Sequence, residues 1–273
     1  MTSRLDRGLN YAILTTFSLI ALYPLVTMLF MALHNPEASI TGFAFPRHID
    51  LHNFIDAWKV GHFSSYMRSS AIVSTSVVAV STLLSTIGGY AFGTMRFRGD
   101  RLLFYVLLLG LILPYEAVII PLYYDERSVG LVDTYWGLIL PEIGFALPFG
   151  IFWMRAFFLA TPRSLIEAAR LDGASSWSIL WRILLPFGKP AVLTLVVLLF
   201  MSTWNEFLLA LVLISNENRR TAPLGLAWFQ DQYTIDPTGL AAGAAIIALP
   251  IVLVYVFLQR HFIRGMLSGA LKG

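Results

Sequence analysis

The chain has 273 residues, of which 57% are hydrophobic and only 13% are charged, and its mean hydropathy is +0.72. Soluble domains are about one quarter charged, so this composition excludes an ordinary soluble protein and predicts an integral membrane protein. The net charge of +3 does not come with the clustered basic patch that a nucleic-acid-binding protein needs. The sequence holds no cysteine, which excludes disulfides, thiolate metal ligands and a cysteine nucleophile.

Six apolar windows follow one another along the chain, and each is long enough for a membrane-spanning helix of about 20 residues. They are residues 9–33, 70–95, 102–124, 136–160, 190–215 and 240–259. The windows are too long and too continuous for the strands of a membrane barrel, which have about 10 residues each. The sequence therefore predicts an all-α polytopic membrane protein with six transmembrane helices, in which residues 1–273 form a single domain.

The distribution of lysine and arginine indicates an orientation. The side of the membrane that holds both termini and residues 161–189 carries 13 of the 19 basic residues, and the other side carries six. The side richer in basic residues is cytoplasmic by the positive-inside rule, so both termini and residues 161–189 are predicted to be cytoplasmic. The longest outer loop, residues 34–69, holds four irregularly spaced histidines without a carboxylate pattern, which favours solvated side chains over a metal site: His34, His48, His52 and His62.

The third and fourth windows contain ionisable residues. Glu116 follows Pro114, where a helix kink frees backbone carbonyls, and it is a candidate for a transport path or for a pair within a dimer. Glu142 and Arg155 lie near opposite ends of the fourth window, and we expect both to face water rather than a pocket.

Residues 161–189 separate the fourth and fifth windows and are too polar to cross a bilayer. Thr161 and Pro162 are typical of a helix start. Gly173 predicts a sharp turn with positive φ. A second helix is expected to begin at Ser175 or Ser176, to end at Pro186, and to be followed by the fifth window from Pro190, while Glu167 and Arg170 can pair at i,i+3 spacing.

The residues alone leave two interpretations of this helix pair open. An apolar stripe of Trp177, Leu180, Trp181 and Leu184 suits a pair that only seats the loop on the membrane surface. The same pair suits a docking element for a soluble partner, because the rest of the chain is embedded in lipid.

The fifth window contains Trp204, Asn205 and Glu206. An aromatic face beside hydrogen-bonding groups is the chemistry that binds a sugar. Asn205 and Glu206 are equally suited to hydrogen-bond neighbouring helices, so both interpretations stay open.

Two other classes of membrane protein fit the number of windows. In an intramembrane serine protease, Ser175 and His261 would be the nucleophile and the base, but Ser175 lies in a charged interfacial loop. A self-contained secondary transporter would usually show inverted repeats, which are not visible here. The sequence has no Walker loop either, so the energy for transport is expected from another subunit.

Residues 167–190 resemble the signature loop of ABC-importer permeases. The matching positions are Glu167, Ala168, Ala169, Asp172, Gly173, Ala174, Trp181, Ile183, Pro186 and Pro190. Five further segments resemble the carbohydrate-importer permeases in the same order along the chain: 89–99, 114–122, 204–207, 221–226 and 259–273. The last of these is similar to the tail of the smaller, maltose-type permease subunit.

This resemblance implies a type I ABC-importer permease of the bacterial inner membrane, with cytoplasmic coupling helices. It implies a heterodimer with a second permease, a dimer of ATPase subunits, and an extracytoplasmic sugar-binding protein. The chain itself is expected to hold no catalytic residue, metal or cofactor, with ATP and Mg²⁺ bound by the ATPase. The implied ATPase-coupling residues are Glu167, Ala168, Ala169, Asp172, Gly173 and Ala174. The resemblance also favours the pocket interpretation of Trp204, Asn205 and Glu206, and Glu116 stays a candidate for the substrate path from its position after Pro114.

Overall fold

The computed structural model describes residues 4–35, 45–46, 49–230 and 235–270, and within these ranges it describes side chains from residue 6 to residue 259. His48 and most of the tail motif at 259–273 therefore lie outside the described side chains. In the described part the regular structure is helical, and an isolated bridge between Gln230 and Ile235 is the one β feature. The prediction of an all-α protein is confirmed.

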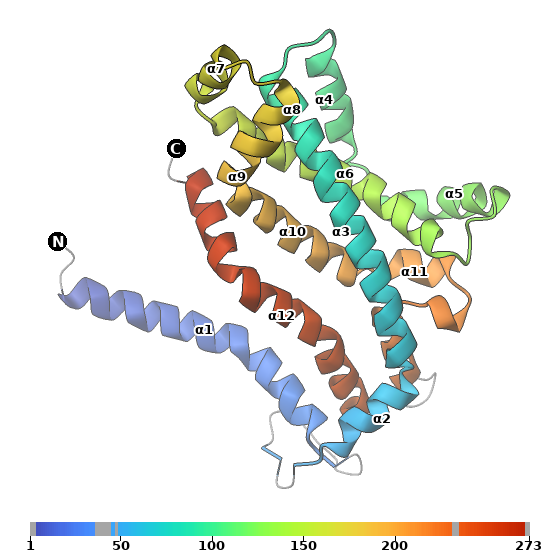
Figure 1. Ribbon diagram of the computed structural model, residues 1–273. Coiled ribbons are helices and arrows are strands. Elements are labelled where there is room, and N and C mark those ends of the chain that lie inside the picture. The colour runs from blue at the N-terminus through green and yellow to red at the C-terminus, as the bar shows by residue number, and fades with distance from the viewer. Residues whose placement is uncertain (1–3, 36–44, 47–48, 231–234, 271–273) are drawn as a thin grey trace. The chain divides into compact units, whose positions relative to one another are not determined.

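Figure 1 shows the helices in chain order. The α-helices are α1 (Arg4–Ala32), α2 (His52–Val60), α3 (Phe63–Thr94), α4 (Asp100–Leu109), α5 (Tyr115–Ser128), α6 (Tyr135–Ala160), α7 (Arg163–Leu171), α8 (Ser176–Ser178), α9 (Leu185–Phe187), α10 (Lys189–Trp204), α11 (Leu208–Leu213) and α12 (Pro237–Ala270). A π-helix, η1, covers Ile179–Leu184, and two 3₁₀ helices, η2 and η3, cover Glu217–Arg219 and Ala222–Phe229.

Four helices are long and apolar enough to cross a membrane: α1 from Asp6, α3, α6, and α12 as far as Gln259. A fifth is added if residues 176–187 and α10, which meet at a bend of 80°, count as one span. The window 102–124 is divided between α4 and α5, and the window 190–215 between α10 and α11. The multi-pass architecture is thus confirmed, while the count of six spans stays a prediction.

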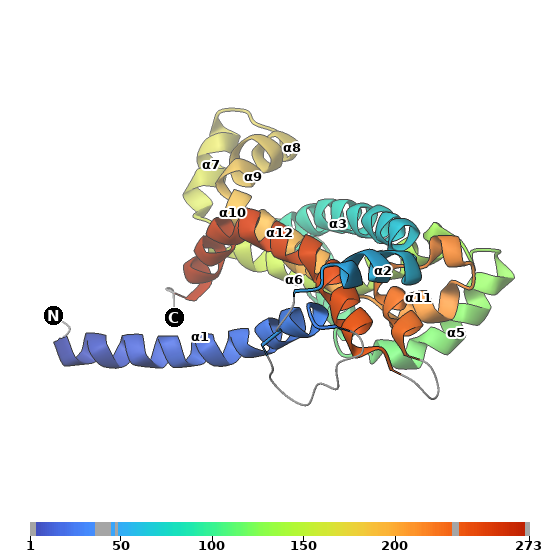
Figure 2. The same ribbon diagram turned by 90° about the horizontal axis from the view of Figure 1, so that it is seen from below.

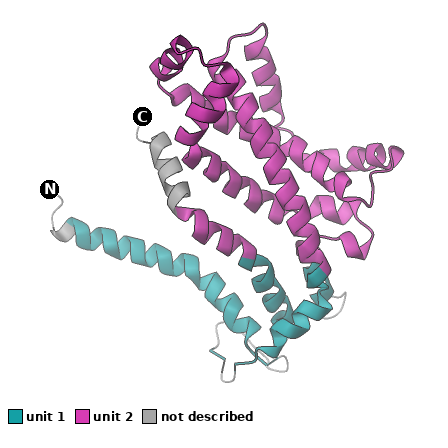
Figure 3. Cartoon of the chain, in the orientation of Figure 1, with its two compact units in different colours: residues 1–64, 225–249 teal, residues 65–224, 250–273 magenta. Residues whose placement is uncertain are grey.

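The chain divides into two compact units, which Figure 3 colours separately. Unit 1 comprises residues 1–64 and 225–249, and unit 2 comprises residues 65–224 and 250–273. In unit 1, the Asn53 side chain on α2 donates to the carbonyl oxygens of Ala32 (2.9 Å) and His34 (2.7 Å). This contact satisfies backbone carbonyls at the end of α1 that have no partner within the helix.

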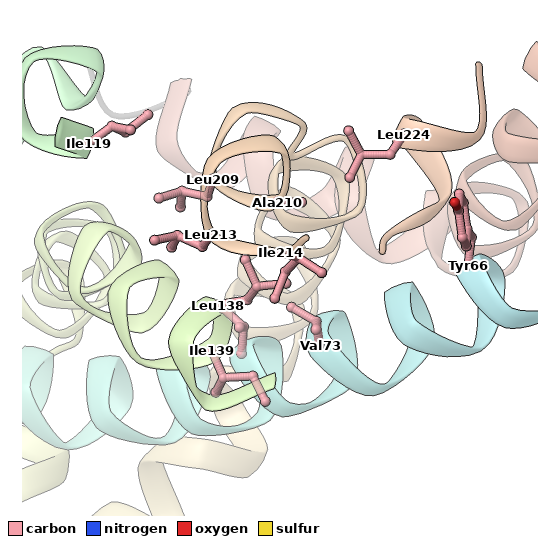
Figure 4. Close-up of a cluster of buried hydrophobic side chains, with 11 residues drawn as sticks. Tyr66, Val73, Ile119, Leu138, Ile139, Leu209, Ala210, Leu213, Ile214 and Leu224 are labelled. Atoms are coloured by element: carbon pink, nitrogen blue, oxygen red, sulfur yellow. The ribbon is translucent and has the colours of Figure 1, made fainter. Parts of the chain in front are cut away.

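A first apolar cluster in unit 2 joins α3, α5, α6 and α11. Figure 4 shows Ile214 beside Leu138 of α6 and Val73 of α3. The buried members are Tyr66, Val73, Val77, Ile119, Leu138, Ile139, Leu209, Ala210, Leu213, Ile214 and Leu224. Because α11 has only six residues, its position depends on this packing more than on its own helix propensity.

A second apolar cluster lies around the contact between α3 and α6. Its buried members are Val78, Tyr90, Met154, Phe158, Ile166, Ala169, Ile179, Leu180, Leu184, Leu195 and Leu199. The two helices approach so closely that a Cβ on Gly89 would lie 2.5 Å from Met154 Cβ and 2.8 Å from the Arg155 nitrogen. Only glycine fits there, which is the usual role of small residues where membrane helices cross.

Arg155 helps to hold this packing and does not simply face water as expected. Its Nε donates to the Phe92 carbonyl of α3 at 3.2 Å, and its guanidinium carbon lies 4.1 Å from the centre of the Phe104 ring of α4. A hydrogen bond and a cation–π contact therefore link three helices through one half-buried side chain.

Candidate functional site

We call residues 161–189 the coupling segment; its short helices lie together at one end of unit 2 in both Figure 1 and Figure 2. Gly173 has φ +79°, and its nitrogen donates to the Arg170 carbonyl at 3.0 Å, while Ala174 donates to Ala169 at 2.9 Å. These bonds close the end of α7 around a left-handed residue, as glycine C-caps do. The predicted glycine turn between two helices is confirmed.

The start of α7 differs from the prediction. Thr161 ends α6 because it precedes Pro162 and has the extended conformation, with ψ 135°. Its buried side chain donates from Oγ1 back to the Phe157 carbonyl at 3.1 Å. Pro162 occupies the N-cap of α7, whose first residue is Arg163. The hydroxyl of Thr161 is thus used by the preceding helix and is not available to cap the next one.

The second half of the coupling segment begins as expected and ends later than expected. Ser175 caps α8, with its Oγ accepting from the Ser178 nitrogen at 3.2 Å. Pro186 lies within α9, one residue before the end of the continuous helix over residues 176–187. The chain bends at Gly188, where a Cβ would lie 2.6 Å from the Phe157 ring, and Pro190 stands in the first turn of α10 as predicted.

The six coupling candidates divide between an outer and an inner face. Glu167, Ala168, Asp172 and Gly173 are exposed. Ala169 is buried in the second cluster and Ala174 packs against it. Leu171, which lies between Arg170 and Asp172 in the sequence, is 89% exposed. Glu167 and Arg170 form no ion pair within the described residues, where the salt bridge found joins His52 and Asp56.

Unit 2 also contains a cavity of about 710 Å³ at the α4–α5 and α10–α11 breaks. Asn205 and Glu206, in the second break, line it together with Tyr115, Phe145 and Thr203. Of the residues predicted for the substrate path, the structure brings these two to the cavity. Trp204 and Glu116 are not among the described residues that line it.

Glu206 is held by backbone groups of α11. One carboxylate oxygen, Oε1, accepts from the Leu209 nitrogen at 2.9 Å, and Oε2 accepts from the Ala210 nitrogen at 3.2 Å. The Tyr115 hydroxyl donates to Oε1 at 3.4 Å. Glu206 therefore caps a short helix that begins within the break and satisfies its free N–H groups.

The neighbours of Glu206 have different environments. Trp204 is buried and stacks on Phe200, with 5.3 Å between the ring centroids. The Asn205 side chain donates to the Met201 carbonyl at 2.7 Å. Glu116 is exposed in the first turn of α5. The Trp204 ring, which was expected to offer an aromatic face to a sugar, thus packs against Phe200 of the same helix instead.

Glu142 is the cavity residue that the sequence analysis missed. It was expected to face water, but it is only 7% exposed and lines the cavity. Thr203 hydrogen-bonds its side chain, and its enclosed Oε2 has no partner among the residues that the structure describes. The signal was present in the sequence, because an ionisable residue inside an apolar window usually faces a cavity or a partner.

The serine proposed as a protease nucleophile has a structural role. Ser175 Oγ accepts the hydrogen bond that caps α8 and is exposed. The side chain of His261 lies outside the described residues.

The chain matches the family model of the binding-protein-dependent transport system inner membrane component over residues 85–268, and it belongs to this family. It is 33% identical to the trehalose transport system permease protein SugB of Mycobacterium tuberculosis, over 98% of each chain. It is 30% identical to the diacetylchitobiose uptake system permease protein NgcG of Streptomyces coelicolor, over 97% of this chain and 89% of that one.

Among solved structures, a chain of a bacterial ABC transporter involved in the import of the acidic polysaccharide alginate superposes with a TM-score of 0.79 at 27% identity. The match covers 96% of this chain and 99% of that chain. A bacterial alginate transporter in complex with a pentasaccharide-bound periplasmic protein matches at a TM-score of 0.68 and 15% identity, which shows the fold alone. The chain is a multi-pass permease subunit of an ABC importer, as residues 167–190 predicted.

Proposed function

We propose that the chain forms half of a sugar-translocation path in an ATP-driven importer and that residues 167–190 couple it to a separate ATPase dimer. The observation that carries the proposal is the two-faced coupling segment. Its outer face exposes Glu167, Leu171 and Asp172, while Ile166 and Ala169 are buried among helices of unit 2. An exposed face with a rigid anchor suits the transmission of force from a protein partner.

The proposed partners are a second permease subunit, an ATPase dimer and an extracytoplasmic binding protein. In this arrangement the coupling segment and both termini are cytoplasmic, as the distribution of basic residues favours. ATP and Mg²⁺ would be bound by the ATPase subunits. A sugar substrate is supported by the names of relatives that match most of this chain.

The link from the coupling segment to the cavity runs through α6. This helix contributes Met154 and Phe158 to the second cluster near one end and Glu142 to the cavity near the other. Its 26 residues span about 39 Å at a rise of 1.5 Å per residue. Closure of the ATPase dimer would move the anchored segment as a rigid body and rock α6, which alternates access to the cavity.

The proposal is tested by purifying the tagged chain from its native membranes in mild detergent and identifying its companions by mass. We expect an ATPase and a second polytopic permease in the wild type, and loss of the ATPase on Glu167→Lys. Ser128→Ala, on an exposed position of α5, is the matched control and should keep both companions. Recovery of the wild-type chain alone, as a stable oligomer, would favour a self-contained transporter.

A further inference from the structure

An open apolar groove of about 270 Å³ lies on unit 2 between α3, the helix Ser176–Phe187 and α10. Its walls include Leu83 of α3, Trp181 of η1 and Val192 of α10, and these side chains are exposed or half-buried. Leu83 and Val192 belong to apolar windows that are long enough to cross a bilayer. The groove therefore opens to the membrane, where an acyl chain or another helix can fill it.

The lining of the groove suits a hydrocarbon chain. Apart from two threonines and Trp181, the described residues that line it are aliphatic. One threonine, Thr86, donates its hydroxyl to the Thr82 carbonyl of the same helix at 2.7 Å. A sugar needs several hydrogen-bonding groups aimed into its site, and this groove does not supply them. None of the groove residues lines the cavity at Glu206, so the two are separate features of unit 2.

Two basic residues lie at the end of the groove where two of its walls converge. The helix Ser176–Phe187 and α10 meet at a bend of 80°, and Leu185 and Val192, on either side of the bend, line the groove. Lys189 is the first residue of α10 and precedes Val192 by three positions, so both lie on one face of that helix. Arg182 lies in η1, the π-helix that contributes the aromatic wall. Both basic side chains are exposed, and neither forms an ion pair with a residue that the structure describes.

The surroundings of these two basic residues indicate the depth of lipid headgroups. They are the only charged residues in the sequence from 173 to 205, so no acidic side chain of that stretch compensates them. Trp177 is 62% exposed and Phe187 is 60% exposed on the same helix. Exposed aromatic residues and basic residues are typical of helix segments at the boundary between hydrocarbon and headgroups. The apolar groove thus ends at a positively charged site at headgroup depth.

We propose that this groove is a binding site for an anionic phospholipid, with one acyl chain between α3, the helix Ser176–Phe187 and α10, and with the headgroup phosphate bound by Arg182 and Lys189. Each basic residue near a membrane surface favours an anionic lipid over a neutral one. An apolar helix of another subunit would fill the groove but would offer these two cations no anion. The bound lipid contacts α3 and the second half of the coupling segment together, so it stabilises the position of that segment.

The indole of Trp181 reports on the occupant, because bromine atoms on an acyl chain quench tryptophan fluorescence on contact. The chain, purified with its companions, is reconstituted in vesicles of phosphatidylcholine. Phosphatidylglycerol or phosphatidylcholine with brominated acyl chains is then titrated in. The signal of Trp181 is the difference between the wild type and Trp181→Phe, which keeps an aromatic ring in the groove. Trp136, which is 61% exposed in the first turn of α6, gives the reference signal through Trp136→Phe.

We expect phosphatidylglycerol to half-quench Trp181 at a mole fraction at least about fivefold lower than phosphatidylcholine does, and we expect no such preference at Trp136. Arg182→Gln combined with Lys189→Gln should remove the preference and leave the quenching itself. Equal mole fractions for the two lipids at Trp181, or the same preference at Trp136, overturn the inference, and this measurement needs no Arg182 or Lys189 variant to fold. A preference that the double variant leaves unchanged also overturns it. If neither lipid quenches Trp181, a protein surface covers the groove and the lipid site is excluded.

Discussion

The acidic side chains of the coupling segment are exposed to solvent, whereas those of the cavity are buried or bound by backbone groups. On the coupling segment, Glu167 and Asp172 are exposed and small or aliphatic residues face inward. In the cavity, Glu142 is buried and Glu206 is bound by backbone N–H groups. Hydrated carboxylates remain free to contact a protein surface, whereas a buried carboxylate requires a donor at fixed geometry. The difference is what the proposed function requires, with protein recognition at the coupling segment and ligand recognition at the cavity.

The largest effect is expected from Trp204→Ala, which tests whether Trp204 belongs to the packing rather than to the ligand site. Trp204 is buried against Phe200, and removing such a side chain costs about 3–5 kcal/mol. Thermal unfolding of the purified complex should show the loss. Trp204→Phe, which keeps an aromatic ring, should recover most of it. If the Trp204→Ala complex is as stable as the wild type but transports poorly, Trp204 belongs to the substrate path.

The second-largest effect is expected from Gly173→Pro, which should disrupt the turn of the coupling segment and leave the rest of the chain folded. Proline fixes φ near −65°, whereas Gly173 has φ +79° and donates its N–H to Arg170, so the turn loses about 3 kcal/mol or more. We expect insertion into the membrane to persist and sugar uptake to be abolished. Gly173→Asn is the control, because asparagine tolerates the left-handed region. Sugar-stimulated ATP hydrolysis at the wild-type rate in Gly173→Pro would contradict the proposed coupling.

Glu206→Ala tests whether Glu206, at the cavity, acts mainly as the cap of α11. Two backbone N–H groups lose their acceptor, which should destabilise the complex by about 1–3 kcal/mol. Glu206→Gln keeps one acceptor oxygen and should be milder. Thermal unfolding in detergent measures both variants. If Glu206→Ala unfolds like the wild type but transports weakly, the capping role is not the important one.

Glu126 lies beyond the third apolar window. It tests whether burial alone raises the pKa of a carboxyl group. Its side chain is 5% exposed, and its Oε2 has no partner within the described part of the chain. Burial raises the pKa of Glu126 from 4.5 to about 7. The folded protein therefore holds this proton more tightly than the unfolded chain, and stability falls as the pH rises from about 4.5 to about 7.

Glu126→Gln should remove this pH dependence and should exceed the wild type in stability at pH 8 by about 1–3 kcal/mol. Unfolding midpoints at pH 5 and pH 8 measure the difference. Ser128→Ala, on the same turn, is the control and should follow the wild type. A wild-type protein with equal midpoints at both pH values would contradict the assignment.

The coupling segment was largely predictable because its determinants are local. A glycine between two helical patterns indicates the turn at Gly173, and Ser175 was placed correctly as a cap. The helix was expected to end at Pro186, but it continues past this residue. This was not predictable, because the π-helix before Pro186 depends on the burial of Ile179, Leu180 and Leu184 against other helices. Sequence patterns contain no signal for such packing.

The cavity was less predictable because its residues come from distant segments. Glu142 reaches it only because α6 packs beside α10, where Thr203 lies. The apolar windows gave continuous spans at 102–124 and 190–215, whereas helices break at residues 110–114 and 205–207. The second break turns Glu206 from a side chain within a helix into the cap of α11.

The most direct test of the link between the two regions is the rate at which a neutral thiol reagent modifies Ser202→Cys, a substitution in the lining of the cavity, in the complete importer. The rate is measured without nucleotide and with ATP held on a hydrolysis-deficient ATPase. Coupling of about 1–3 kcal/mol predicts a change of about 5- to 150-fold in the wild-type background, and loss of that change in Gly173→Pro. Equal rates in the two nucleotide states, or an undiminished change in Gly173→Pro, would contradict the account.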